Sequence, residues 1–131
     1  MKAVYATGTN YDDPLSVLEV GTMPEPETKP FWSTIRVNSA SVNHHDVWSL
    51  QGVGLSDEQT PMILGTDAAG VLEEDIPVRK GLKAGSEVVL YTFVGTDGAG
   101  VMPGERRSIL SERYAGTMAE YTQVPSANVF A

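Results

Sequence analysis

Thirteen glycines and eight prolines divide this chain into short segments, and this division most limits the folds that it can adopt. The segments between them are rich in Val, Ile, Tyr and Thr, which favour β-strands. The sequence contains no βαβ unit, so we expect no dinucleotide-binding domain within the chain. We predict a mainly β domain, a closed or nearly closed β-barrel with one or two short helices, because closure removes unpaired strand edges.

Seven segments are predicted as strands: 1–7, 16–23, 32–41, 61–74, 86–95 and two within 116–131. In the third, Ile35 and Val37 alternate with polar residues, which is typical of a half-buried strand. Small residues and glycines interrupt the apolar run 61–74, and they permit close approach of a neighbouring backbone. The alternation of Tyr91 and Phe93 with their neighbours predicts that only one face of 86–95 belongs to the core.

A short helix is predicted between Asn43 and Leu50. Asn43 is a favourable N-cap residue, and Asp46 follows it three positions later, where a carboxylate stabilises the first turn. Gly52 ends the helix.

Composition excludes several classes of protein. At 131 residues with 41% apolar content, the chain is one folded domain, and it has neither a membrane-spanning apolar run nor the apolar centre of a signal peptide. The absence of cysteine excludes disulfides and thiolate metal sites and fits a reducing cytoplasm. A net charge of −8 argues against a nucleic-acid partner. We expect a cytoplasmic protein that binds a small molecule, without membrane or nucleic acid.

The glycine-rich loop 95–108 does not match a phosphate-binding loop. Gly98 and Gly100 begin a G-x-G pattern, but Pro103 stands where the third glycine would be, and Gly104 is followed by Glu105. The pair Arg106 and Arg107 beside Glu105 is interpreted as a solvated loop tip.

Both histidines of the chain are adjacent, and the segment His44-His45-Asp46 admits three interpretations: a metal site, a proton relay or ordinary helix surface. On a helix the two rings point about a third of a turn apart, so they cannot easily share one metal ion. Only Asp46 and Asp67 could complete such a site, and we expect no bound metal.

Four stretches, in order and spacing, resemble one known family: ASVNHHDVWSLQG, PMILGTDAAGVLEE, GLKAGSEVVLY and GTMAEYTQVPSANVF. They are similar to the N-terminal, GroES-like catalytic domain of medium-chain dehydrogenases and reductases. The resemblance covers nearly all of residues 1–131 and implies an NAD(P)H-dependent oxidoreductase. Its Rossmann domain, which mainly binds the cofactor, would follow this region and is not in the chain. We therefore expect the chain alone to be inactive.

At the positions where zinc-dependent members carry a cysteine and a histidine ligand, this chain has Asn43 and Thr66, and Asp67 stands at the family's glutamate. An amide and a hydroxyl are poor zinc ligands. The chain therefore resembles the zinc-independent, quinone oxidoreductase-like branch. A zinc-dependent alcohol dehydrogenase with altered ligands and a non-catalytic GroES-like interaction module remain alternatives, and the resemblance allows a homodimer in the longer protein.

The resemblance also implies roles for single residues. His45 and Asp67 are expected to be catalytic, and Asn43, His44 and His45 to contact the cofactor. Trp48 and Thr66 are the expected substrate contacts. Simpler roles compete with these: Asn43 as a helix cap, Trp48 as a buried anchor and Asp67 as a structural hydrogen-bond acceptor.

Overall fold

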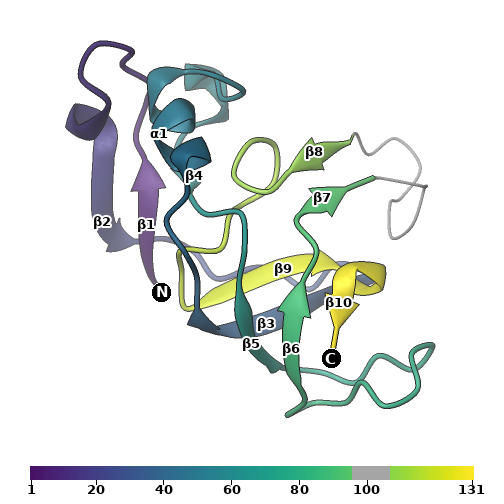
Figure 1. Ribbon diagram of the computed structural model, residues 1–131. Coiled ribbons are helices and arrows are strands. Elements are labelled where there is room, and N and C mark those ends of the chain that lie inside the picture. Colours follow the sequence, from purple (N-terminus) through teal and green to yellow (C-terminus); the bar gives the residue numbers. More distant parts are fainter. Residues whose placement is uncertain (96–106) are drawn as a thin grey trace.

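The computed structural model describes residues 1–95 and 107–131 (Figure 1). Several predictions concern positions outside these residues: Gly98, Gly100, Pro103, Gly104, Glu105 and Arg106. Arg107 is described, and it is exposed as predicted.

The described strands form two larger sheets and one isolated pair (Figure 1). The first sheet has the order β2-β1-β4, the second β10-β6-β5-β3-β9, and the pair is β7-β8. Their bounds are β1 Lys2–Ala6, β2 Leu18–Thr22, β3 Trp32–Ser39, β4 Met62–Ile63, β5 Ala69–Leu72, β6 Glu87–Leu90, β7 Phe93–Val94, β8 Ser108–Ile109, β9 Tyr121–Pro125 and β10 Val129–Phe130.

The predicted mainly β fold with a short helix is confirmed, and the described strands form three sheets rather than one closed ladder. The helix α1 spans His44–Gln51, and single turns of 3-10 helix occur at η1 (Pro14–Val17), η2 (Asp57–Gln59) and η4 (Ser126–Asn128). The segment before β9 connects the two larger sheets, because its carbonyls accept hydrogen bonds from both: Val4 N–H donates to Met118 O at 2.8 Å, and Val37 N–H donates to Glu120 O at 2.9 Å. No helix of the described residues is long and apolar enough to cross a membrane.

Two buried clusters form the core. The larger joins the five-stranded sheet to the segment after β8 and includes Ile35, Leu72, Leu110, Val124 and Val129. The smaller joins α1 to the first sheet, because Leu50 of the helix packs with residues of β1, β4 and the segments beside them: Ala6, Leu55, Met62 and Leu64. This smaller cluster fixes the helix against β1 and β4.

Two predicted strands are each divided in two. The run 61–74 becomes β4 and β5, in different sheets, because the chain turns at Gly65, where φ is +99°. The run 86–95 becomes β6 and β7, because the Asn128 side chain donates to the carbonyls of Tyr91 at 3.0 Å and Phe93 at 2.8 Å. Tyr91 and Phe93 are each 45% exposed, so the prediction that they belong to the core face of this segment was wrong.

The predicted close backbone approach occurs at Gly70 on β5. A Cβ there would overlap the carbonyl oxygen of Arg36 on β3, the strand that pairs with β5. This pairing places the residues just before β5 beside the end of β3, from which the chain continues to α1.

Replacing Gly70 with alanine should lower the free energy of unfolding by about 1–3 kcal/mol, because the added methyl group overpacks the β3–β5 contact. Gly8→Ala is a matched control, since a Cβ at that position would meet nothing closer than 3.5 Å. Urea unfolding of both variants would measure the difference, and an equal effect of the two substitutions would contradict the close packing.

Candidate active site

The helix α1 begins and ends as predicted. Asn43 is its N-cap, with extended backbone at φ −118° and ψ 159°, and it forms a capping box with Asp46. Gly52 adopts the left-handed conformation at φ 91° and caps the C-terminus, where its N–H bonds to Ser49 O.

Asp46 connects the start of α1 to the turn between β4 and β5. Its side chain is only 4% exposed. One carboxylate oxygen accepts the backbone N–H of Asn43 at 2.8 Å, and the other accepts the backbone N–H of Gly65 at 3.0 Å. The sequence predicted the first of these contacts as a cap, but not the second, which joins two separate segments.

The Asn43 side chain points toward the same turn. Its amide nitrogen donates to three oxygens: Asp67 Oδ2 at 3.1 Å, Ser41 Oγ at 3.3 Å and Thr66 Oγ1 at 3.4 Å. We call these four residues the polar cluster: Ser41, Asn43, Thr66 and Asp67. Because an amide has two N–H groups and three acceptors are present, one contact is shared.

Asp67 is the charged member of the polar cluster. Partial burial raises the pKa of its carboxyl, but the hydrogen bonds from the side chain and backbone of Ser41 and from Asn43 outweigh burial, so the pKa lies below its ordinary value of 3.8. The Ser41 hydroxyl donates at 2.7 Å and its N–H at 2.9 Å. Asp67 is therefore an ionised acceptor at neutral pH, and its charge is held by donors of the chain itself.

Sequence reasoning brought together three of the four members, Asn43, Thr66 and Asp67, but missed Ser41. The signal available for it was its position two residues before the N-cap, where a serine hydroxyl lies close to whatever the cap contacts.

His45 lies apart from the hydrogen bonds of the polar cluster. Its Nε2 is 2.9 Å from Glu112 Oε1, and its Nδ1 is 3.5 Å from Ser49 Oγ. Among the hydrogen bonds between described residues, none joins His45 to Thr66 or Asp67. Glu112 was missed by sequence reasoning, because it lies 67 positions from His45 in the chain.

His45 and Glu112 border a cavity of about 500 Å³. Its other described lining residues come mainly from β7 and β8 and are Phe93, Val94, Arg107, Ser108 and Ile109. The cavity therefore has an apolar side from these strands and a polar end at the His45–Glu112 pair.

His44 lies at the surface of α1. Its ring is exposed and meets the edge of Trp48 one turn later, with the ring centroids 4.8 Å apart and an interplanar angle of 74°. Trp48 is 47% exposed, so its interpretation as a buried anchor was wrong. The two rings form an exposed pair on one face of α1.

Within the described part of the chain, no three His, Asp or Glu side chains are grouped so that they could hold a metal ion. The polar cluster offers an amide, two hydroxyls and one carboxylate, whereas zinc sites use thiolates and imidazoles with few carboxylates. These donors do not fit a zinc ion.

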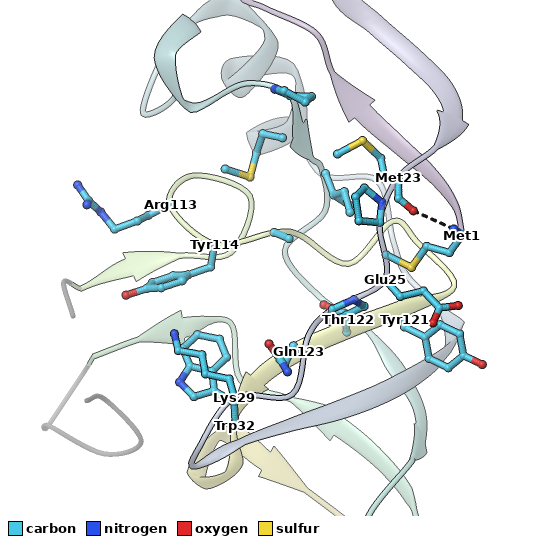
Figure 2. A pocket seen from close by; sticks show the side chains of 16 residues that line it. Met1, Met23, Glu25, Lys29, Trp32, Arg113, Tyr114, Tyr121, Thr122 and Gln123 are labelled. Carbon is cyan, nitrogen blue, oxygen red and sulfur yellow. Dashed lines mark hydrogen bonds between the residues drawn. The ribbon is translucent and has the colours of Figure 1, made fainter. Parts of the chain in front are cut away.

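A second cavity, of about 400 Å³, lies against β9 and the turn that precedes β3 (Figure 2). Its wall includes Met23, Met62 and Trp32, and the Lys29 ammonium lies 4.0 Å from the centroid of the Trp32 ring. None of its lining residues belongs to the polar cluster or the His45–Glu112 pair, so this cavity is separate from the predicted site.

Comparison with known proteins places these features in a family. A family model described as the alcohol dehydrogenase GroES-like domain matches residues 29–131. Comparison with curated protein sequences gave no match. Among solved structures, an NAD-dependent alcohol dehydrogenase is 34% identical with a TM-score of 0.79, over 99% of this chain and 39% of that one.

Two further structures extend the comparison. A thermostable alcohol dehydrogenase from Pyrobaculum aerophilum, in a cobalt and zinc bound form, is 28% identical with a TM-score of 0.79, over 100% of this chain and 40% of that one. The alcohol dehydrogenase of the archaeon Aeropyrum pernix is 24% identical with a TM-score of 0.77, over 99% of this chain and 39% of its own, and shares the fold. The chain thus spans 39–40% of the length of these enzymes.

Replacing Asp46 with asparagine should lower the free energy of unfolding by about 1.5–3 kcal/mol, because the amide retains one acceptor oxygen for two backbone N–H groups. Asp75→Asn is the control, since Asp75 is exposed and, among the described residues, accepts a single hydrogen bond, from the Ala84 N–H at 2.9 Å. Chemical denaturation would compare them, and a cost for Asp46→Asn no larger than that of the control would contradict the connecting role of Asp46.

Asp67 should make stability depend on pH in a defined direction. Because its folded pKa is lowered, the ionised carboxylate stabilises the native state above its unfolded pKa, and this contribution is lost as pH falls through the folded value, below 3.8. The stability advantage of the wild type over Asp67→Asn should therefore shrink as pH falls from about 5. Unfolding curves across that range test this, and a difference independent of pH would contradict it.

Proposed function

Because the chain belongs to the alcohol dehydrogenase GroES-like domain family of the medium-chain dehydrogenases and reductases, we propose that it forms the substrate-side domain of an NAD(P)H-dependent oxidoreductase that acts on a carbonyl, alcohol or quinone without catalytic zinc. The observation that carries this proposal is the polar cluster. Its amide, hydroxyls and ionised carboxylate are bonded to one another beside the start of α1, which suits a hydrogen-bonding site better than a zinc site.

Within the polar cluster, Asn43 and Thr66 are the groups that we assign to ligand oxygens. The Asn43 amide shares two N–H groups among three acceptors, so an incoming oxygen can replace the longest of these contacts, the 3.4 Å bond to Thr66. That exchange also frees the Thr66 hydroxyl to bond to an oxygen of a second ligand. We therefore assign Thr66 to the substrate and Asn43 to the cofactor side.

Asp67 supports a positioning role in this proposal rather than direct proton transfer. Three N–H and O–H groups already donate to it, and its lowered pKa keeps it ionised, so it has no proton to give at neutral pH. It orients Asn43 and Ser41 by accepting their hydrogen bonds.

The two histidines take different parts. The His44 ring is exposed and packs against Trp48, and this exposure supports the proposal that His44 contacts the cofactor pyrophosphate. His45 faces the cavity beside β7 and β8, which supports contact with the substrate. Trp48 would then border the bound ligands from the helix surface.

NAD(P)H, when bound, supplies the hydride to the substrate carbon, and we assign most of its binding to a Rossmann domain in a longer protein. This chain covers only 39–40% of the length of the dehydrogenase structures, which supports the assignment of cofactor binding to a further domain. The isolated chain is proposed to be inactive, cytoplasmic and bound to no nucleic acid or membrane, and the longer protein is proposed to form a homodimer.

One observation favours a second candidate, a zinc-dependent enzyme with altered ligands. The Pyrobaculum aerophilum structure, 28% identical over the whole chain, is a cobalt and zinc bound form. The two candidates differ in whether Asn43 and Thr66 can take part in binding zinc.

Elemental analysis of the chain, purified without chelator and then equilibrated with zinc, should find no stoichiometric metal. The variant Asn43→Cys/Thr66→His supplies a thiolate and an imidazole at the same positions, so it should retain more zinc than the wild type. Asn38→Cys/Thr34→His, on β3 outside the polar cluster, is the matched control and should resemble the wild type. Stoichiometric zinc in the unmodified chain would overturn the zinc-independent assignment.

A further inference from the structure

His45 is held by a residue that the family resemblance does not assign. Its Nε2 lies 2.9 Å from Glu112 Oε1, and the two side chains are only 20% and 25% exposed. Hydrogen bonds between partly buried groups are stronger than those in water, because the surroundings have a lower dielectric. This contact therefore constrains the imidazole ring before any ligand is present.

The local backbone places Glu112 for this contact. It follows Ser111, a non-glycine residue with φ of +72°, in a turn closed by a hydrogen bond of 2.8 Å from Ser111 N–H to Tyr114 O. On the opposite side stands Gly54, where a Cβ would overlap the Glu112 carboxylate. The turn at Ser111 directs the Glu112 carboxylate toward His45, and the absence of a side chain at Gly54 leaves space for it.

The contact also selects which ring nitrogen carries the proton. An ionised carboxylate only accepts hydrogen bonds, so Nε2 of His45 must be the protonated nitrogen beside Glu112. In the neutral ring Nδ1 is then an acceptor, and the buried Ser49 hydroxyl lies 3.5 Å from it. Ser49, His45 and Glu112 therefore form one directed chain of groups.

We propose that Glu112 is a positioning residue for His45. Glu112 fixes the imidazole of His45 in its Nε2–H tautomer, with the ring against the cavity beside β7 and β8. This inference rests on the proposed function, because only there does His45 meet a substrate. His45 was expected to act on its own as a catalytic and cofactor-contacting residue. Because its Nε2–H is directed to Glu112, a substrate would instead meet His45 and Glu112 as a pair.

The cavity indicates the class of substrate that the pair would meet. Phe93, Val94 and Ile109 supply apolar surface, and the His45–Glu112 pair supplies the polar end. A volume of about 500 Å³ is within the range of sites for small organic molecules. The cavity thus suits an alcohol with an apolar body, whose hydroxyl can donate to the Glu112 carboxylate at the His45–Glu112 end.

The test is imidazole ¹⁵N NMR of the 131-residue chain. The chain has only two histidines, so His44→Gln assigns their signals, and His44 serves as an internal control. In the wild type, His45 should show one protonated and one unprotonated nitrogen at a pH where the ring is neutral. In Glu112→Ala these two signals should move toward the averaged values of a ring that exchanges between tautomers, while those of His44 stay unchanged.

Two further variants separate positioning from general loss of structure. Glu112→Gln keeps an acceptor oxygen and should retain part of the Nε2–H preference. Glu58→Ala removes an exposed carboxylate elsewhere and should leave both histidines unchanged. Circular dichroism confirms folding in each case. His45 signals that do not move in Glu112→Ala would overturn the inference.

The NMR result for the His45 tautomer can fail or hold independently of the proposed function. A longer protein that continues this chain and shows no hydride transfer with any carbonyl, alcohol or quinone would refute the proposed function and leave the tautomer result intact. If that protein is active, Glu112→Ala should lower kcat more than it changes KM, and its effect should not add to that of His45→Ala, because the two residues act as a unit. Additive effects would contradict the pairing.

Discussion

The carboxylate of Asp46 is the interaction on which the arrangement of the site depends. It is buried, and it accepts one backbone N–H from the start of α1 and one from the turn at Gly65. A buried carboxylate is stable only when its oxygens are satisfied, so these two segments must stay together for the native state to persist. The contact of Leu50 with the core beside β1 and β4 holds the rest of the helix in the same position.

Two sites of different character follow from that anchoring. Asn43, just before the helix, is directed to Thr66 and Asp67, while His45, two residues later, faces Glu112. The helical rotation that separates successive side chains therefore distributes neighbouring residues between a polar cluster and a cavity. His44 takes a third direction, toward the surface. The adjacent histidines thus have different surroundings, His45 beside Glu112 and His44 against Trp48 at the surface.

Much of this could be predicted from the sequence where the cause is local. The cap at Asn43, the helix end at Gly52 and most strands depend on residues within a few positions of one another, and the structure confirms them. The contacts of Gly65 and Glu112 could not be predicted, since their partners are distant in the chain. The breaks within 61–74 and 86–95 also required tertiary information, because an apolar run does not reveal where the backbone will pair with a side chain such as that of Asn128. Family resemblance located Thr66 and Asp67, but it could not supply Ser41 or Glu112.

Native-state amide hydrogen exchange tests the anchoring most directly. If the Asp46 carboxylate holds the turn, the Gly65 N–H should exchange far more slowly than an unprotected amide. Its rate should be similar to that of the Leu72 N–H at the end of β5, which donates to Ser86 O at 2.9 Å. The Asn43 N–H, bound to the same carboxylate, should be protected as well. Rapid exchange at Gly65 while Leu72 stays protected would show that the turn is not held to α1, and it would contradict the account of the site.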